Sequence, residues 1–397
     1  MSRELFTYKN NELHLGTSAT NLASLVKEYE NPTWVYDLSI IKERLRVMQS
    51  WRRSARIYYA MKANFNSEIL KVFQHAGAGV DVVSLGEMRQ AISCGFKPQD
   101  IIFSGVGKSE KELRWAIENK IYQINTESLS EIDKIIKLSS ELNVDVEIGI
   151  RFNPEVDPET HPGIATSLKD AKFGLEKKAV EEAVEKIKKH PHVKMKSLSF
   201  HLGSQIMNLD VYQKAIRVVL PFYQQIKKDY PDLDRLDLGG GLGIDYRNHQ
   251  LDADEERWHR LTKIYDEELY GFKDHLILEP GRFLVARSAV LLAKVEIIKK
   301  TPHRHFLILD AGMSLLMRPA LYQAYHDIKP VRLDSTSPLV SYDIVGPICE
   351  SSDVFHKEFL MPELNEGDFV AICDVGAYGA SMSSRYNLRE EANEIFI

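Results

Sequence analysis

Two reactive side chains stand directly after apolar, β-branched stretches of this sequence. Lys62 follows the run 57–60, so burial could lower the pKa of its amine and make it a nucleophile toward a carbonyl group. Glu279 follows the run 276–278, where a carboxylate is costly unless it meets a cation or a hydrogen-bond donor. A protonated pyridine nitrogen would satisfy Glu279, and so would a structural salt bridge to an arginine. For Lys62 the alternative is a surface lysine that begins a loop.

A glycine run and a histidine stand at the ends of two further apolar stretches. Residues 239–243, GGGLG, could let backbone N–H groups close around a phosphate, although glycines after a strand can also make nothing more than a tight turn. His201 could stack on a flat ring or could be an ordinary core histidine. Together with Ser204 and the run 279–282, EPGR, these residues favour an active site over the separate alternatives.

The elements that must position these residues repeat along the chain. From about residue 55, short apolar stretches alternate with longer stretches of helical period, and the eight candidate strands end in YYAMKAN, VDVVS, IIFSG, YQINT, EIGIRFN, SLSFHLG, RLDLGGG and LILEPG. Eight such units predict a (β/α)8 barrel of parallel strands over residues 36–280. In that α/β fold the catalytic groups lie at the C-terminal ends of the strands.

One of the intervening stretches shows why a helix is expected between strands. Residues 177–189 place four apolar side chains on one stripe, and two Glu and Lys pairs at i, i+4 spacing lie outside it. The stripe consists of Val180, Ala183, Val184 and Ile187, and the expected pairs are Glu182 with Lys186 and Glu185 with Lys189.

After Gly281 the pattern changes to strand-like stretches without helices of barrel length between them. These stretches are AVLLAKVEIIKK, HFLILDAG, PLVSYDIVG and DFVAICDVGAY, and the first residues contain a hairpin-like LFTYKNNELHLG. We therefore expect residues 1–35 and 281–397 to form a second, β-rich domain of sandwich-like or barrel-like form.

Length and composition agree with a two-domain enzyme. A chain of 397 residues exceeds what one hydrophobic core usually organises, and a net charge of −6 argues against a nucleic-acid surface. Cys94, Cys349 and Cys373 are odd in number and have neither disulfide-framework nor metal-ligand spacing, so a reducing cytoplasm is expected and no metal site. The sequence shows no signal peptide and no membrane-spanning run, which predicts a soluble protein without a membrane partner.

The motifs together resemble a known family. YAMKAN (59–64), DVVSLGEM (81–88), HPGIATSLKDAKFGL (161–175), HLGSQI (201–206), DLGGGLGI (237–244), EPGR (279–282), GPICESSD (346–353) and DVGAYGASMSSRYN (374–387) occur in the order of the diaminopimelate decarboxylase family. That family belongs to the alanine-racemase-like class of pyridoxal 5'-phosphate decarboxylases. The resemblance covers nearly the whole chain and implies conversion of meso-diaminopimelate to L-lysine and carbon dioxide, the last step of bacterial lysine biosynthesis.

The resemblance also implies roles for single residues. Lys62 would hold the cofactor, His201 would stack on its ring, and Glu279 would contact the ring nitrogen. The resemblance assigns the phosphate to Ser204, Gly241, Gly281, Arg282 and Tyr378, and the substrate to Arg282, Arg318, Tyr322, Glu350 and Tyr378. Cys349 would return a proton to the product, and Cys349 and Glu350 would reach the barrel of the opposite subunit of a homodimer.

The chemistry explains why these residue types are needed. Decarboxylation leaves an electron pair on the α-carbon, and a protonated pyridine ring accepts it. A racemase of this class is expected to have arginine in place of Glu279, so EPG favours a decarboxylase. Arg318 and Glu350 suit a distal centre that bears a carboxylate and an ammonium group. Without the resemblance, Arg318 would be taken for a surface or interface arginine and Cys349 for a small core residue.

The sequence departs from the family pattern at three positions, and other functions remain open. Leu85 and Ser167 stand where glycine is usual, and Arg385 lies in a C-terminal signature without proline, which puts loop conformation and substrate breadth in doubt. The nearest alternative is a related decarboxylase acting on ornithine, lysine or a carboxylated polyamine precursor. A non-catalytic carrier or regulatory homologue is a further alternative, but such proteins are expected to lack the second domain, the lysine or the cysteine loop.

Overall fold

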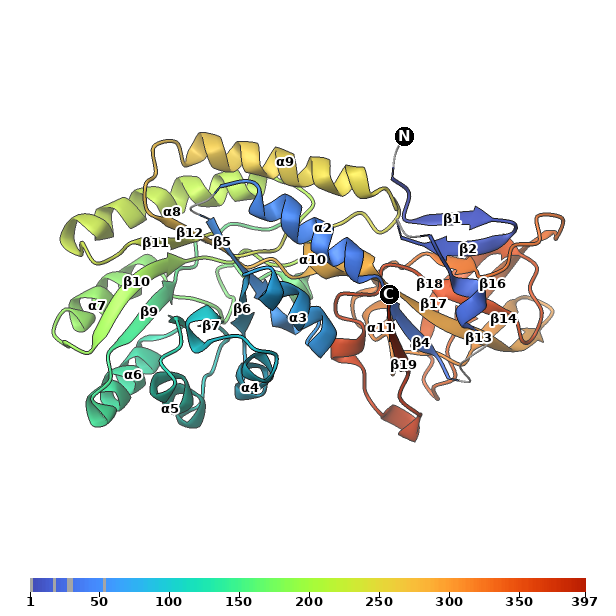
Figure 1. Cartoon of the computed structure of the whole chain (residues 1–397), viewed down its shortest axis with the longest axis horizontal. Coiled ribbons are helices and arrows are strands. Elements are labelled where there is room, and N and C mark those ends of the chain that lie inside the picture. The colour runs from blue at the N-terminus through green and yellow to red at the C-terminus, as the bar shows by residue number, and fades with distance from the viewer. Residues whose placement is uncertain (1–2, 17–18, 27–30, 53–54) are drawn as a thin grey trace. The chain divides into compact units, whose positions relative to one another are not determined.

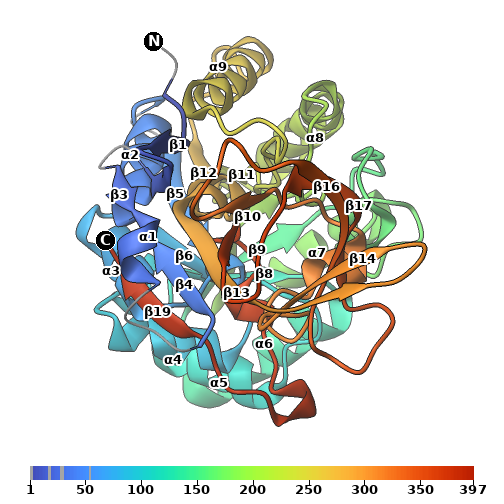
Figure 2. The same ribbon diagram turned by 90° about the vertical axis from the view of Figure 1, so that its right-hand side faces the viewer.

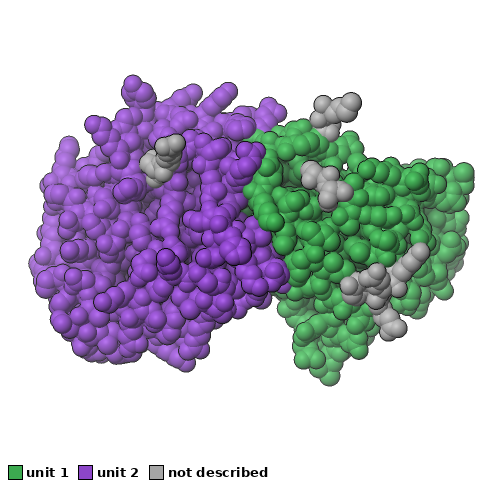
Figure 3. Space-filling view, viewed as in Figure 1, with its two compact units in different colours: residues 1–44, 244–255, 284–397 green, residues 45–243, 256–283 purple. Residues whose placement is uncertain are grey.

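The computed structural model describes residues 3–16, 19–26, 31–52 and 55–397, and the chain divides into two compact units (Figure 3). Unit 1 comprises residues 1–44, 244–255 and 284–397, and unit 2 comprises residues 45–243 and 256–283. The expected functional boundaries, 36–280 and 1–35 plus 281–397, stay a prediction, because packing does not show which residues serve a cofactor.

Unit 2 contains a closed barrel of eight parallel strands, which confirms the predicted fold class (Figure 1). Each strand pairs with the next along the chain, and the last pairs with the first through Leu276 and Ala55. The strands are β5 (Ala55–Ala60), β6 (Gly79–Val82), β7 (Ile101–Phe103), β8 (Gln123–Thr126), β9 (Val146–Arg151), β10 (Val193–Ser199), β11 (Arg235–Asp237) and β12 (His275–Leu278). All eight predicted strand regions are therefore present.

Helices alternate with the barrel strands, and several of them begin at side-chain caps. Ser84, Ser109 and Ser128 each accept a hydrogen bond from the backbone N–H three residues later, which satisfies a donor that the first helical turn leaves open. The helices are α2 (Leu38–Gln49), α3 (Ser67–His75), α4 (Leu85–Ser93), α5 (Glu110–Glu118), α6 (Leu129–Leu142), α7 (Lys177–Ile187), α8 (Asp210–Asp229) and α9 (Leu251–Glu268).

Helix α7 confirms the predicted helix over 177–189, but its charged pairs are different from those expected. The four apolar residues of the stripe are buried as predicted. Lys186 pairs with Asp133 of α6 at 2.8 Å, and Lys188 pairs with Glu185 at 2.5 Å, one residue closer than the i, i+4 spacing that was expected. A neighbouring helix thus supplies a carboxylate that the local spacing could not reveal.

Unit 1 is built on an eight-stranded sheet, part of which faces the viewer in Figure 2. The order is β15-β18-β13-β14-β16-β17, and β4 pairs with both β13 and β19. The strands are β4 (Thr33–Tyr36), β13 (Ala289–Lys300), β14 (His305–Leu309), β15 (Ile328–Pro330), β16 (Leu339–Val345), β17 (Val354–Pro362), β18 (Phe369–Ile372) and β19 (Asn393–Phe396). The four predicted strands are present, and β4, β15, β17 and β19 were not predicted.

The predicted N-terminal hairpin is also present in unit 1. Strands β1 (Phe6–Lys9) and β2 (Glu12–Leu15) are joined by Asn10 and Asn11, whose φ angles of 50° and 64° suit a two-residue hairpin turn. With β3 (Thr20–Asn21) the hairpin forms a three-stranded sheet of its own rather than an extension of the large one. Its leucines join a core with Val35 and Val290, so the hairpin still belongs to the β-rich unit.

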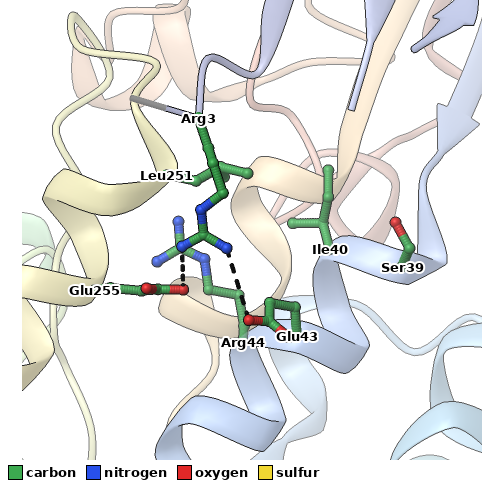
Figure 4. Close-up of a pocket in the computed structure, with 7 residues that line it drawn as sticks. All are labelled: Arg3, Ser39, Ile40, Glu43, Arg44, Leu251 and Glu255. Atoms are coloured by element: carbon green, nitrogen blue, oxygen red, sulfur yellow. Dashed lines mark ion pairs between the residues drawn. The ribbon is translucent and has the colours of Figure 1, made fainter. Parts of the chain in front are cut away.

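Arg3 ties the beginning of the described chain to the helices of unit 1. Its guanidinium lies 2.6 Å from Glu255 and 3.7 Å from Glu43, in a small pocket that Arg44 also lines (Figure 4). The same guanidinium lies 2.6 Å from Asp252. These side chains are partly exposed, so the pairs fix the position of the chain more than they stabilise it. No helix among the described residues is long and apolar enough to cross a membrane.

Candidate active site

Lys62 and Asp81 meet at the carboxyl ends of the first two barrel strands. Lys62 lies in a single turn of 3-10 helix (Met61–Ala63) directly after β5, and its Nζ lies 3.2 Å from Asp81 Oδ2 at the end of β6. Asp81 is fully buried, and its second oxygen has no hydrogen-bond partner among the described residues. The side chain of Lys62 remains 36% exposed, so its amine can still meet a ligand.

Three buried carboxylates gather in the barrel beside this amine. Asn125 Nδ2 of β8 donates to Glu279 Oε1 at 3.3 Å and to Asp237 Oδ2 at 3.5 Å. Burial and the charges of Asp237 and Asp81 raise the pKa of Glu279 well above its ordinary value, and burial raises the pKa of Asp237 to about 7. Among the described residues no arginine pairs with Glu279, so the structural salt bridge left open by the sequence is not present.

His201 follows β10 and is held as a neutral ring. Its Nδ1 accepts a hydrogen bond from the backbone N–H of Gly240 at 3.2 Å, which leaves the proton of the neutral imidazole on Nε2. Burial, Lys62 and Arg151 lower the pKa of His201 well below its ordinary value. The carbonyl of His201 accepts from Thr166 Oγ1 at 2.9 Å and from Arg151 at 3.3 Å, so both ends of the residue are fixed.

The glycine run after β11 forms a tight backbone cradle. A Cβ added at Gly240 would lie 2.1 Å from the carbonyl oxygen of Glu279, and one at Gly241, where φ is +98°, would lie 2.4 Å from that of Gly203. No acceptor meets the backbone N–H of Gly241 or Gly281 in the described part of the chain. Ser204 Oγ accepts from Arg282 at 2.9 Å, which adds a hydroxyl and a guanidinium.

These features fit a pyridoxal phosphate. The amine of Lys62 suits its aldehyde, and the buried carboxylate cluster suits its ring nitrogen. The cradle of N–H, hydroxyl and guanidinium donors suits its phosphate. The seven predicted residues that lie in unit 2 share the C-terminal strand ends of one barrel. They are Lys62, His201, Ser204, Gly241, Glu279, Gly281 and Arg282.

The other five predicted residues, Arg318, Tyr322, Cys349, Glu350 and Tyr378, lie in unit 1. Arg318 begins the short helix α11 (Arg318–Tyr322) and is 4% exposed, so it is not a surface arginine of this unit. Its Nη1 donates to His326 Nε2 at 2.6 Å, and its guanidinium lies 4.8 Å from the ring centre of Tyr246. His326 Nδ1 lies 2.8 Å from the carbonyl of Cys373, which fixes the histidine and hence Arg318.

The loop 346–353 carries Cys349 and Glu350. Its inside is organised by the buried carboxylate of Asp353, which accepts from the N–H groups of Met313 at 2.6 Å and Ile348 at 2.8 Å. Cys349 and Glu350 stand exposed at the tip of the loop. Cys349 is therefore not the buried core residue that its isolated context suggested, whereas Cys94 and Cys373 are buried.

Tyr378 belongs to a segment that begins at Asp374, and both residues have left-handed backbones with φ of 57°. Asp374 is held there by Arg287 at 2.8 Å and by His249 Nδ1 at 2.9 Å. His249 Nε2 lies 2.9 Å from Asp327, so one imidazole bridges two carboxylates. This buried ion network fixes the start of the segment that leads to Tyr378.

Residues 38–286 match the family described as pyridoxal-dependent decarboxylase, pyridoxal binding domain. The diaminopimelate decarboxylase of Aquifex aeolicus is 36% identical over 390 residues, which cover 98% of this chain and 91% of the relative. That of Zymomonas mobilis is 38% identical over 386 residues, covering 95% and 90%. The crystal structure of diaminopimelate decarboxylase from Helicobacter pylori complexed with L-lysine has a TM-score of 0.90 at 37% identity and covers 95% of this chain and 94% of that one. The chain belongs to the diaminopimelate decarboxylase family.

Several residues that support the site of this decarboxylase were not predicted from the sequence. Asp81 and Asn125 contact the predicted side chains from strand ends, and Asp237 lies beside them. Of these three, only Asp81 has a sequence signal, because it is the one charged residue of the otherwise apolar strand β6. His326 and Asp353 hold Arg318 and the cysteine loop, and neither carries a signal of its own in the sequence. Their roles follow from contacts between segments that are distant along the chain.

Proposed function

We propose that this decarboxylase removes one carboxyl group of meso-2,6-diaminopimelate and releases L-lysine and carbon dioxide, the last step of lysine biosynthesis. The observation that carries the proposal is the barrel mouth, where the Lys62 amine lies 3.2 Å from Asp81 beside the buried acids Asp237 and Glu279. Relatives that are 36–38% identical over nearly the full chain bear the name of this activity.

The barrel residues would hold the cofactor in three places. Lys62 would bind its aldehyde carbon, Glu279 would keep its ring nitrogen protonated, and the cradle of Ser204, Gly241, Gly281 and Arg282 would bind its phosphate. When bound, pyridoxal phosphate supplies an electron sink for the pair that decarboxylation leaves on the α-carbon. The neutral ring of His201 would cover one face without adding positive charge, since its pKa is lowered.

Residues of unit 1 would select the substrate and complete the reaction. The distal carboxylate would pair with Arg318 and the distal ammonium group with Glu350. Tyr322 and Tyr378 of unit 1, and Arg282 of the barrel, would make the other substrate contacts. Arg318 suits a carboxylate because its guanidinium is buried and is held in place by a histidine nitrogen that accepts its hydrogen bond. The thiol of Cys349 would return the proton to the α-carbon.

We further propose a homodimer in which Cys349 and Glu350 serve the barrel of the partner subunit. Both residues stand exposed at a loop tip of the single chain, which suits groups that reach another subunit. We also infer a cytoplasmic location, since three free cysteines fit a reducing compartment. Mixing Lys62→Ala with Cys349→Ala protein tests the shared site: hybrids should regain activity, whereas an unshared site would give none.

The proposed activity is tested by carbon dioxide release from meso-diaminopimelate, L-lysine and ornithine, with and without added pyridoxal phosphate. Only the first should be turned over efficiently. Lys62→Ala should abolish both turnover and the visible absorbance of the bound cofactor, while the surface variant Lys71→Ala should keep both. Preference for ornithine or lysine would replace the proposed substrate, and an active, coloured Lys62→Ala protein would refute the assignment of the lysine.

A further inference from the structure

The tip of the loop 346–353 is held by a second segment of unit 1. Asp353 fixes the inside of the loop, but Cys349 and Glu350 project from it into solvent. An exposed glutamate ordinarily keeps much of its rotamer freedom, and ordering it costs conformational entropy. If Glu350 is to pair with the distal ammonium group of the substrate, another residue must therefore hold its carboxylate in one position.

That support comes from two consecutive residues, Tyr386 and Asn387. Tyr386 Oη donates to Glu350 Oε1 at 2.6 Å, and Asn387 Oδ1 accepts from the backbone N–H of Cys349 at 3.2 Å. One contact fixes the glutamate side chain, and the other fixes the main chain at the cysteine. Both residues of the tip are thus held by the same short turn, which we name the 386–387 clamp.

The clamp is itself fixed to unit 1. The N–H of Ser384 donates to the carbonyl of Ser314 at 2.7 Å, and the turn continues into a 3-10 helix (Tyr386–Leu388). Asn387 has φ 57° and ψ 20°, a left-handed conformation that asparagine adopts more readily than most residues. Asparagine at position 387 thus suits the left-handed backbone and also supplies the acceptor of the hydrogen bond from Cys349.

We propose that Tyr386 and Asn387 are positioning residues of the decarboxylase, Tyr386 orienting the Glu350 carboxylate for substrate choice and Asn387 fixing the main chain that carries the Cys349 thiol. This inference rests on the proposed function, because it assigns the clamp to the two residues that would contact the substrate. The two clamp residues have separate roles, because Tyr386 contacts Glu350 and Asn387 contacts the main chain of Cys349.

Tyr386→Phe tests the first role because it keeps the ring and removes only the hydroxyl. KM for meso-diaminopimelate should rise about three- to tenfold, the loss expected for one solvent-exposed hydrogen bond of ordinary strength, with kcat little changed. Tyr270→Phe is the matched control, because Tyr270 is 92% exposed in unit 2, and it should change neither constant. An unchanged or lowered KM in Tyr386→Phe would overturn the role of Tyr386.

Asn387→Gly and Asn387→Asp test the second role. Glycine keeps the left-handed backbone but removes the acceptor, whereas aspartate keeps an acceptor oxygen. Hydrogen–deuterium exchange of the Cys349 amide should be at least about threefold faster in Asn387→Gly and close to wild type in Asn387→Asp. The kcat should fall in Asn387→Gly and recover in Asn387→Asp, with KM less affected.

The experiments distinguish a failure of the clamp proposal from a failure of the proposed function. If wild-type protein does not release carbon dioxide from meso-diaminopimelate, the proposed function fails, while the exchange measurement still tests the contact to Cys349. If wild-type protein is active and Asn387→Gly shows wild-type exchange and kcat, the role of Asn387 is refuted. Equal losses of kcat in Asn387→Gly and Asn387→Asp would also refute it, because they would show damage unrelated to the acceptor.

Discussion

We predict that His249 makes unit 1 more stable at neutral than at alkaline pH. The imidazole lies 2.9 Å from both Asp327 and Asp374. Burial disfavours the charged ring, but the hydrogen bonds to Asp327 and Asp374 outweigh burial and raise the pKa of His249 to about 9. Because the pKa is raised in the folded state, the stabilisation is complete below the ordinary value of 6.5 and is lost as the pH rises through about 9.

The size of the effect follows from that interval. A rise from 6.5 to about 9 corresponds to about 3 kcal/mol, at roughly 1.4 kcal/mol for each pKa unit. The side chain of His249 is 14% exposed, so water screens the interaction only weakly. His249→Gln removes the titration and keeps a polar side chain of similar length. The stability advantage of wild type over this variant should therefore be about 3 kcal/mol larger at pH 6 than at pH 10.

Urea unfolding of both proteins, measured at intervals from pH 6 to pH 10, checks this prediction. His192→Gln is the control, because His192 also meets one carboxylate, Asp145 at 2.8 Å, but in an exposed pair that should contribute less than about 1 kcal/mol. Parallel stability curves for wild type and His249→Gln over the whole range would refute the reasoning, since they would show that the bridging imidazole does not titrate differently on folding.

Three further perturbations test the barrel mouth and the substrate residues. Gly240→Ala should strongly lower the melting temperature, because its Cβ would lie 2.1 Å from the carbonyl oxygen of Glu279, whereas Gly86→Ala, with a nearest contact of 3.5 Å, should leave it unchanged or slightly raised. Arg318→Ala should reduce carbon dioxide release from meso-diaminopimelate by at least about tenfold, and wild-type release by this variant would contradict the pairing of Arg318 with the distal carboxylate. Asp353→Asn should lower the free energy of unfolding by about 1–3 kcal/mol in denaturant titrations, since one of two buried N–H groups loses its acceptor.

The barrel could be predicted from sequence because its signal is local and repeated. Most residues of the parallel strands are buried, so the strands contain short apolar stretches, and these alternate with stretches of helical period. The missed strands of unit 1 do not belong to such a repeat. Strands β4, β15 and β19 are isolated stretches of three or four residues, and β17 contains Glu358 with φ 53°, where an irregular register with β16 breaks the alternation. Such strands form because they pair with segments that are distant along the chain, and the pattern of one segment alone does not show that pairing.

The same difference applies to the site: local sequence patterns identify some of its residues, and only contacts between distant segments identify the others. Lys62 and Glu279 could be found because a reactive side chain at the end of an apolar strand is visible in the sequence. The roles of Asp81 and Asn125 could not be predicted, because a polar residue in a strand shows no function until barrel closure places it beside Lys62 or Glu279. The residues of unit 1, including Arg318, came from the family resemblance, since no periodicity marks them.

The pairing of β4 with β19 constrains how the protein is made. Residues 33–36 lie in parallel register with residues 393–396, and residues 289–292 occupy the other side of β4. During synthesis the TWVY segment (33–36) is therefore translated long before its partner strands. Until those strands are made, its backbone N–H and C=O groups can pair with other extended chains. Ribosome-bound chains that still lack β13 and β19 should consequently bind holdase chaperones through this segment.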